Sequence, residues 1–430
     1  MRFFYSPSPA DVQKLKESGD YIMSEKKRNA LIGQSGGPTA AINATLSGIV
    51  RELRAQGTAG TVYGTLYGIS GVIDDRIIEI GSRLRSEEDF RLLECTPSSA
   101  LGSCRLKLPP VEETGVYEKI FATFEKYNIG CFLLIGGNDS MDTVDKLSAY
   151  AKTHGKDVTV IGVSKTIDND LVVADHTPGY GSAAKYIATV CEEICGDCAI
   201  YTTKAVTVVE IMGRDAGWLT AAAALPRLYG LPCPDLVYLP EVAFHETDFL
   251  AQVRRLLAEK PNVVVAVSEG IHDENGEYTG SATKNGATDV FGHKYLAGAG
   301  KYLENLVKET LGCKVRSVEL NLPQRCAGHC LSATDIEESV RVGREAARAA
   351  AAGKTGGFAI LRRADGPAYA TVTDTVEVAL VANKIKKVPL EYITEDKANV
   401  TDALLAYLAP MIAGEVDVPK KDGLPLRFTF

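Results

Sequence analysis

The feature that most constrains the fold of this chain is the repeated alternation of short apolar runs with stretches of helical pattern. The runs end in glycine or turn residues, and they span residues 30–34, 131–135, 158–163, 205–212, 262–267 and 357–361. Strands that alternate with helices pair in parallel, because the connection between two parallel strands needs a crossover segment, usually a helix. The sequence therefore predicts an α/β protein with mostly parallel sheets, and its 430 residues suffice for two or three domains.

Paired glycines follow the first two runs. Gly36 and Gly37 stand between the first run and a helical pattern, where backbone N–H groups and a helix N-terminus can hold a phosphate group. Gly136 and Gly137 occupy the same place after the second run, and Asp139 begins the helix that follows. A simple tight turn and a helix-capping aspartate are the alternative interpretations, and each glycine pair alone does not decide between them.

A cluster of ionisable side chains follows the third run, and it consists of Lys165, Thr166, Asp168 and Asp170. Ligands of parallel sheets bind beyond the carboxyl ends of the strands, so this cluster lies where a ligand is expected. Phosphoryl transfer needs a carboxylate that accepts the proton of the attacking hydroxyl, and cations that hold the phosphates. A surface turn rich in Asp and Asn is the alternative interpretation.

Arginine recurs after the later runs, at Arg214, Arg316 and Arg325. A guanidinium group binds phosphate oxygens with two parallel hydrogen bonds, so we expect the three to converge in one crevice as a sugar-phosphate site. Glu269 follows another run and would hold sugar hydroxyls. Taken singly, each arginine is more often a partner in a surface salt bridge, so the prediction depends on the whole set.

Composition excludes several classes of partner. The net charge is −8 at pH 7 and no run of five Lys or Arg occurs, so we expect no nucleic-acid partner. No apolar stretch is long enough to span a membrane and the first residues lack a signal-peptide pattern, so we expect a cytoplasmic protein. Cys195 and Cys198 form the only CxxC, which we interpret as reduced structural thiols, and we give His176 and His329 no catalytic role.

The residues at these run ends belong to seven ordered motifs: SGGPTAAIN (35–43), LGSCR (101–105), GGNDS (136–140), KTIDND (165–170), MGRDAG (212–217), SEG (268–270) and PQR (323–325). With these motifs the chain resembles the phosphofructokinase family, and most closely its pyrophosphate-dependent branch, over most of its length. The resemblance implies two Rossmann-like three-layer α/β/α domains. It also implies the division of the chain: an N-terminal extension at 1–28, a phosphoryl-donor domain at 29–180 with about 324–390, and a fructose 6-phosphate domain at 181–323 with about 391–430.

The resemblance also implies the roles of the site residues. Asp168 would be the general base that takes the proton of the C1 hydroxyl of fructose 6-phosphate, and Lys165, Asp139 and Arg105 would complete the catalytic set, with Arg105 offsetting charge on the transferring group. The sugar phosphate would be bound by Thr166, Ile167, Asp168, Asp170, Met212, Gly213, Arg214, Glu269, Arg316, Leu322 and Arg325. The donor would be bound by Gly36, Gly37, Arg105 and Lys165, and the cofactor would be Mg²⁺ near Asn138.

Two positions indicate the donor, because the ATP-using members of the family carry glycine where this chain has Asp139 and Lys165. A carboxylate at 139 would repel the α-phosphate of ATP, and two charges about 4 Å apart cost roughly 4 kcal/mol at an effective dielectric near 20. Lys165 adds a compact cation that suits pyrophosphate. We therefore expect reversible transfer from pyrophosphate to fructose 6-phosphate. The alternatives are an ATP-dependent 6-phosphofructokinase and a non-catalytic regulatory subunit that binds sugar phosphate, against which Asp168 argues.

Three positions depart from the family pattern. Asn138 replaces an aspartate that family members usually have near the Mg²⁺, so the metal would arrive mainly on the pyrophosphate. Ala205 stands where many relatives place an arginine that reaches into the neighbouring subunit, and Lys204 could substitute for it. Ser47 stands where ATP-dependent bacterial members have an effector-binding arginine, so we expect no such nucleotide regulation. The expected assembly is a homodimer or a homotetramer.

Overall fold

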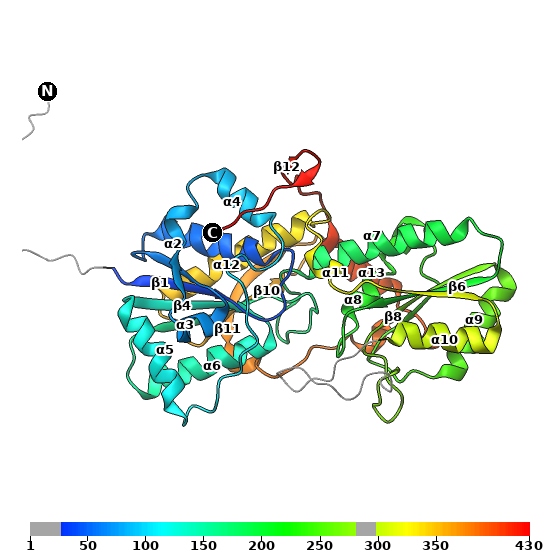
Figure 1. Ribbon diagram of the computed structural model, residues 1–430, viewed down its shortest axis with the longest axis horizontal. Coiled ribbons are helices and arrows are strands. Elements are labelled where there is room, and N and C mark those ends of the chain that lie inside the picture. Colours follow the sequence, from blue (N-terminus) through cyan, green and yellow to red (C-terminus); the bar gives the residue numbers. More distant parts are fainter. Residues whose placement is uncertain (1–26, 281–297) are drawn as a thin grey trace, which may run out of the picture.

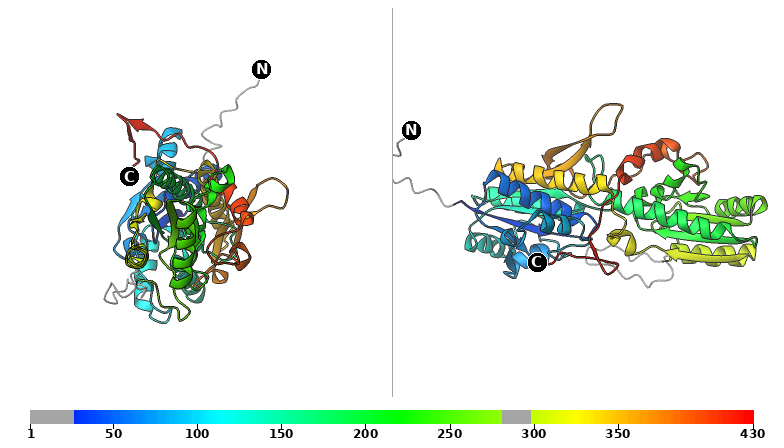
Figure 2. Two further views of the ribbon diagram at one scale, coloured as in Figure 1. Left: turned by 90° about the vertical axis from the view of Figure 1, so that its right-hand side faces the viewer. Right: turned by 90° about the horizontal axis from the view of Figure 1, so that it is seen from above.

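The computed structural model describes residues 27–280 and 298–430, and they form two lobes that lie side by side along the longest axis of the molecule (Figure 1). Most of the predicted N-terminal extension at 1–28 lies outside the described residues. Seen from above, the two lobes lie end to end, and the loop between β10 and β11 projects from the first lobe (Figure 2). Each lobe is built around one β-sheet.

The first sheet has seven strands in the order β11-β10-β5-β4-β1-β2-β3. All neighbouring strands in it are parallel except the two edge pairs, β10 with β11 and β2 with β3. Its strands are β1 (Asn29–Gln34), β2 (Val62–Thr65), β3 (Ile77–Glu79), β4 (Ile129–Gly136), β5 (Thr159–Ser164), β10 (Gly357–Arg363) and β11 (Thr371–Glu377).

The second sheet has four parallel strands in the order β7-β8-β6-β9. They are β6 (Ala205–Ile211), β7 (Leu236–Tyr238), β8 (Asn262–Ser268) and β9 (Lys314–Glu319). Near the C-terminus β12 (Lys420–Lys421) and β13 (Leu424–Pro425) form a separate short antiparallel pair. The six apolar runs of the sequence correspond to β1, β4, β5, β6, β8 and β10, so the predicted α/β class with mostly parallel sheets is confirmed.

Helices cover both faces of each sheet. The helices of the first lobe are α2 (Ile42–Gln56), α3 (Gly68–Ile73), α4 (Glu87–Glu94), α5 (Thr114–Lys126), α6 (Asn138–Thr153) and α12 (Ala333–Ala351). Those of the second lobe and the junction are α7 (Tyr180–Ala199), α8 (Trp218–Ala222), α9 (Glu246–Glu259), α10 (Ala299–Leu311), α11 (Pro323–Cys326) and α13 (Asp402–Leu408). The short 3-10 helices are η1 (Gly81–Arg83), η2 (Leu225–Tyr229), η4 (Val378–Leu380), η5 (Leu390–Tyr392) and η6 (Ala409–Ile412). Among the described residues, no helix is both long enough and apolar enough to cross a membrane.

Alternation along the strands produces this layering, because successive side chains of a strand point to opposite faces of its sheet. In β1, Ala30 and Ile32 are buried against α2 and α12, whereas Leu31 is buried in a separate cluster with α3, α5 and α6. The second sheet is covered in the same way, by α7, α8 and α13 on one face and by α9 and α10 on the other. Figure 1 shows both pairs of layers.

Helices α2 and α12 come close enough that two positions admit only glycine. A Cβ atom on Gly48 would lie 2.1 Å from the carbonyl oxygen of Val340, and one on Gly343 would lie 2.1 Å from that of Thr45. The close approach joins a helix from the beginning of the chain to one that follows the second sheet. It therefore fixes where the chain returns from the second lobe to the first.

The end of the chain differs from the predicted domain assignment. Phe428 and Phe430 pack against the core cluster beneath α2 and α12, and the Phe428 N–H donates to Thr96 Oγ1 at 2.9 Å. Asp417 also pairs with Arg91 on α4. The prediction that everything after about 391 belongs with the second lobe is therefore wrong for this segment, because its two aromatic rings gain a buried surface on the first lobe.

Candidate active site

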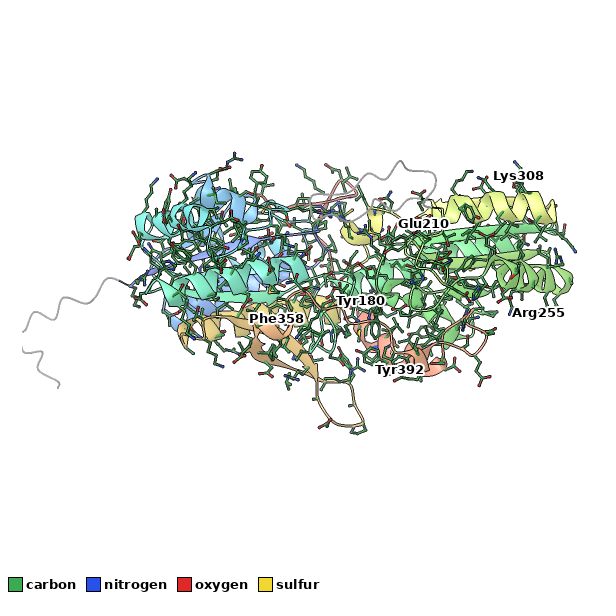
Figure 3. The ribbon with its side chains drawn as sticks, turned by 90° about the horizontal axis from the view of Figure 1, so that it is seen from below. Tyr180, Glu210, Arg255, Lys308, Phe358 and Tyr392 are labelled. Atoms are coloured by element: carbon green, nitrogen blue, oxygen red, sulfur yellow. The ribbon has the colours of Figure 1, made fainter. Side chains whose placement is uncertain are left out.

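The two sheets meet at a cavity of about 580 Å³. Its walls come from the segments that follow β1, β4 and β5 of the first sheet and β6, β8 and β9 of the second. In Figure 3, Tyr180 lies at the junction of the lobes, whereas Arg255 and Lys308 lie at the far end of the second lobe. Every residue that the sequence predicts for the site lines this cavity except Arg316 and Leu322.

Lys165 forms the floor of the cavity near the first glycine turn. Its side chain is 2% exposed, and the Nζ atom donates to the Gly37 carbonyl at 2.7 Å. A Cβ atom on Gly36, which has φ +76°, would lie 3.4 Å from this Nζ, so glycine lets the ammonium approach the turn closely. Burial lowers the pKa of Lys165 to about 8, and the carboxylates of Asp168 and Asp170 oppose that shift.

Asp139 lies in the first turn of α6, which begins directly after the second glycine turn. Gly136 is needed there, because a Cβ atom on it would lie 2.2 Å from the Cβ atom of Ser140. The Asp139 side chain is exposed on the cavity wall, where the positive end of α6 favours a negative charge. The same wall carries Asn138 and the exposed Arg105.

The loop after β5 holds its carboxylates in a buried environment. The Thr166 hydroxyl donates to Asp168 Oδ2 at 3.2 Å, and it accepts from the Asp168 N–H at 3.1 Å. Burial raises the pKa of Asp168 above its usual range, with the Thr166 hydrogen bond and Lys165 acting against this shift. Burial, together with the charge of Asp168, raises the pKa of Asp170 to about 7. The loop therefore holds one carboxyl group, Asp170, that can take up a proton near neutral pH, and a second, Asp168, that is more basic than an ordinary aspartate.

Glu269 and Gly213 form the wall that the second sheet contributes. The Gly213 N–H donates to Glu269 Oε1 at 3.3 Å, and burial raises the pKa of Glu269 to about 7. Gln324, which is buried, accepts from the Met212 N–H at 3.2 Å and so ties the PQR motif to the end of β6. Arg214 has a buried Nε atom without a hydrogen-bond partner among the described residues.

Arg325 lies between the two walls. Its Nη1 atom is 3.5 Å from the position that a Cβ atom would take on Gly37. Burial lowers the pKa of Arg325, the charge of Arg105 lowers it further, and Asp168 acts in the opposite direction. These contacts place the guanidinium near the donor glycines as well as the catalytic loop, closer to that end than the sequence predicts.

Arg316 does not converge with Arg214 and Arg325 within this chain, which corrects the expectation from the sequence. It lies opposite Thr207 in the middle of β9, an edge strand that continues to Glu319, and its side chain is exposed. Leu322, the other predicted residue outside the cavity lining, is 51% exposed. The cause is the length of β9, which carries Arg316 away from the carboxyl end of the sheet.

The described residues contain no group of three or more His, Cys, Asp or Glu side chains that could hold a metal ion. Both polar atoms of the Asn138 amide make hydrogen bonds to the backbone: Nδ2 donates to the Lys384 carbonyl at 2.7 Å, and Oδ1 accepts from the Asn383 N–H at 2.5 Å. Mg²⁺ is often bound by one or two carboxylates and the oxygens of a substrate phosphate. The cavity therefore fits a metal that is held partly by a substrate phosphate, with Asp139 available, and the described residues form no preformed cage.

Some residues of the cavity were missed by sequence reasoning. Asp215, Asn321 and Ile385 line it, and Lys386 contacts the catalytic loop from behind. Asp215 belongs to the MGRDAG motif, so a signal was present. Ile385 and Lys386 stand more than 200 positions after the catalytic loop and belong to none of the motifs, so only the fold brings them to the site.

Cations and carboxylates at the carboxyl ends of parallel strands are the groups that a phosphotransferase needs. The sequence model of the phosphofructokinase family matches residues 29–350, and the chain belongs to this family. The resemblance that the seven motifs carry is thereby confirmed.

Relatives in the family cover nearly the whole chain. A pyrophosphate–fructose 6-phosphate 1-phosphotransferase from Xanthomonas campestris is 39% identical over 401 residues, which are 92% of this chain and 94% of the relative. The enzyme of the same name from Halomonas elongata is 37% identical over 403 residues, 93% and 95% of the two chains. Among solved structures, a pyrophosphate-dependent phosphofructokinase from Marinobacter aquaeolei is 35% identical with a TM-score of 0.82, covering 94% of this chain and 96% of its own.

Proposed function

We propose that this protein transfers a phosphoryl group reversibly from pyrophosphate to the C1 hydroxyl of fructose 6-phosphate, giving fructose 1,6-bisphosphate and phosphate. The observation that carries the proposal is the buried ammonium of Lys165 at the Gly36–Gly37 turn, with a carboxylate of the same loop beside it. A small and highly charged donor gains most from a compact cation in a site of low dielectric. The names of the relatives described above agree with this donor.

The donor lies between the two glycine turns in this proposal. Gly36 and Gly37 present backbone N–H groups, Lys165 binds from the floor, and Arg105 offsets the charge that develops on the transferring group. Asp139 excludes the α-phosphate of a nucleotide from the other wall, because a carboxylate repels it. The site therefore favours a donor that does not extend past Asp139.

Asp168 acts as the general base. Burial raises the pKa of this carboxylate above its usual range, so it is a stronger proton acceptor than an ordinary aspartate. Thr166 fixes the orientation of the carboxylate through the two hydrogen bonds that it makes with Asp168. Ile167 and Asp170 complete the loop beside the reacting hydroxyl.

The sugar phosphate lies against the wall of the second sheet. Glu269, held by the Gly213 N–H, accepts hydrogen bonds from sugar hydroxyls, and Met212 packs beside the ring. Arg214 and Arg325 bind the 6-phosphate with their guanidinium groups. Arg316 and Leu322 can take part only from a second copy of the chain, because they lie outside this chain's own cavity. Such a role agrees with the homodimer or homotetramer that the sequence predicts.

The carboxylate of Asp139 on the cavity wall would hold Mg²⁺ together with oxygens of the pyrophosphate, and the bound ion would offset negative charge on the phosphates. Asn138 can contribute at most a remaining lone pair of Oδ1, because its amide already binds backbone groups. The chain's own cations, Lys165 and Arg105, carry the rest of the charge compensation.

The test is a coupled assay of purified protein with saturating fructose 6-phosphate and each donor in turn. We expect kcat/KM for pyrophosphate to exceed that for ATP by a factor on the order of a thousand, the size of the repulsion at Asp139. Faster turnover with ATP would overturn the donor assignment and leave family membership intact. Turnover with neither donor, with fructose 6-phosphate bound normally, would favour the non-catalytic alternative.

A further inference from the structure

Residues 383–388 connect three parts of the active site, and we call them the positioning segment. At its start it contacts Asn138 at the N-terminus of α6. In its middle it contacts the catalytic loop, residues 165–170. At its end the Val388 N–H donates to Glu241 Oε1 of the second lobe at 2.9 Å. The segment therefore runs from the donor wall, behind the catalytic loop, to the other lobe.

Lys386 makes the central contacts of this segment. Its backbone N–H donates to the Asp170 carbonyl at 2.7 Å. Its Nζ atom donates to Asn169 Oδ1 at 3.2 Å, to the Ala174 carbonyl at 3.2 Å and to the Asp175 carbonyl at 2.7 Å. An ammonium has three N–H donors, so these bonds use all of them. The Lys386 side chain is not part of the cavity lining and binds protein groups alone.

The Lys386 ammonium is buried beside charged groups of both signs. Burial lowers the pKa of this ammonium to about 8, Asp175 and Asp170 act against that shift, and Arg363 adds to it. The ring of Trp218 lies 5.0 Å from Nζ, and its Nε1 donates to the Lys386 carbonyl at 3.0 Å. The ammonium is thus enclosed by the catalytic loop, by the residues that follow it and by α8.

Asn169 connects the Lys386 side chain to the two carboxylates of the catalytic loop. It stands between Asp168 and Asp170 and has φ +54°, a left-handed conformation that asparagine adopts more readily than most residues with a side chain. Its Oδ1 atom is held by Lys386. Asn169 lies between the two carboxylates in the chain, so a contact that holds Asn169 also restrains the backbone on either side of it.

Asn138 makes the contact that holds the start of the segment. It accepts from the Asn383 N–H and donates to the Lys384 carbonyl, so it needs one acceptor and one donor on the same side chain. An aspartate of the same shape could accept but not donate, and its second oxygen would face the carbonyl oxygen of Lys384. The amide that departs from the family pattern is therefore the side chain that this backbone pairing requires.

We propose that residues 383–388 are a positioning element of the active site, in which Lys386 holds the catalytic loop in place and Asn138 anchors the segment instead of binding the metal. This inference rests on the proposed function, since it names the residues that orient its base. Lys386 and Asn138 are positioning residues, because they act on the chemistry through Asn169 and through the backbone of 383–384.

Lys386→Met tests the central contact, because it removes the three donors and the charge but keeps the chain length and the backbone hydrogen bond to Asp170. We expect kcat to fall about 10- to 100-fold, the effect of a misplaced catalytic group, with KM for both substrates within about threefold of wild type. Lys308→Met, the same change at an exposed position far from the cavity (Figure 3), should leave both constants unchanged. An unchanged kcat, or a tenfold rise in KM alone, would overturn the role of Lys386.

Asn138→Asp tests the anchor with a readout that does not depend on the donor. Trypsin cleavage after Lys384, Lys386 and Lys387, followed by mass spectrometry, should speed up about tenfold, because losing one hydrogen bond favours local opening by roughly that factor. Asn305→Asp on the exposed face of α10 is the matched control and should leave cleavage at these sites unchanged. This variant also serves as the test if Lys386→Met does not fold.

The same variant separates the anchor from a metal ligand. If Asn138 bound Mg²⁺, the added carboxylate of Asn138→Asp would lower the half-saturating Mg²⁺ concentration and leave cleavage at the segment as in wild type. That pair of results would overturn the proposal. Faster cleavage of the variant, in a protein that prefers ATP to pyrophosphate, would support the positioning role of residues 383–388 and refute pyrophosphate as the donor. The failure of one proposal can therefore be distinguished from the failure of the other.

Discussion

The two ends of the cavity hold their cations in different ways. At the donor end, Lys165 is 2% exposed and already hydrogen-bonded to the Gly37 carbonyl. At the sugar-phosphate end, Arg214 has a buried Nε atom that no described residue pairs with. The cation of the donor end is thus hydrogen-bonded to the protein itself, whereas Arg214 at the other end has a buried N–H group without a partner among the described residues.

This difference matches the two anions that we propose. A compact ammonium in a buried site interacts strongly with a small, dense anion, and a guanidinium group fits the oxygens of a single phosphate by two parallel hydrogen bonds. Selection among donors therefore resides in the first lobe, at Lys165 and Asp139. Recognition of the phosphorylated sugar resides in the second lobe, with Arg325 reaching across the junction toward the donor glycines.

We expect the largest loss of activity from a substitution of Asp168, the catalytic base that serves both ends of the cavity. Asp168→Asn keeps the size of the side chain and removes the proton acceptor, so kcat should fall by about 10²- to 10⁴-fold. Binding of fructose 6-phosphate, measured by calorimetry, should stay within about threefold of wild type, because asparagine keeps the size of the side chain and an oxygen that can accept a hydrogen bond from the sugar. Asp197→Asn on the exposed part of α7 is the control. Full activity of Asp168→Asn would show that another group accepts the proton.

The donor end is tested by Asp139→Gly combined with Lys165→Gly. Loss of the ammonium removes a charge-assisted hydrogen bond to pyrophosphate, which corresponds to a decrease of about 10- to 150-fold in kcat/KM for that donor. Loss of the carboxylate relieves the repulsion of a nucleotide, so kcat/KM for ATP should rise. The ratio of the two constants, measured in one coupled assay, is the readout. A ratio equal to that of wild type would move donor selection away from the first lobe.

The sugar-phosphate end is tested by Arg214→Lys. Lysine keeps the charge but cannot form two parallel hydrogen bonds, so KM for fructose 6-phosphate should rise about tenfold while KM for pyrophosphate stays constant. Arg255→Lys, at the far end of the second lobe (Figure 3), is the matched control. An equal rise in both KM values would mean that the two ends of the cavity are not separate sites.

Sequence reasoning recovered the parts of the molecule that depend on local pattern. The apolar runs correspond to strands, and the glycines that follow β1 and β4 line the cavity. These glycines could be recognised because a turn that brings the backbone close to a ligand requires glycine. The same reasoning misplaced Arg316. Strand β9 has exposed charged residues at both ends, so its pattern does not reveal where it stops, and three further residues carry the strand to Glu319.

Contacts that depend on tertiary structure could not be predicted. Lys386 touches the catalytic loop across a separation of 217 positions, and nothing in its neighbourhood distinguishes it from the exposed Lys387. Asn138 could be recognised as a departure from the family pattern, but its reason became visible only when the Asn383 and Lys384 backbone was found against it. Local sequence thus predicts which groups do the chemistry better than which groups hold them.

The smallest effect concerns the protonation of the base, and Thr166→Val measures it. The Thr166 hydrogen bond lowers the pKa of Asp168, so its loss should raise that pKa by about one unit, since a hydrogen bond to a charged group contributes at least about 1.4 kcal/mol. The base works only when deprotonated, so the acid side of the kcat/KM profile should move to higher pH by the same amount. Activity at the plateau should change little, whereas activity on the acid side of the profile should fall several-fold. A profile that falls uniformly at all pH values would mean that Thr166 orients Asp168 without affecting its charge.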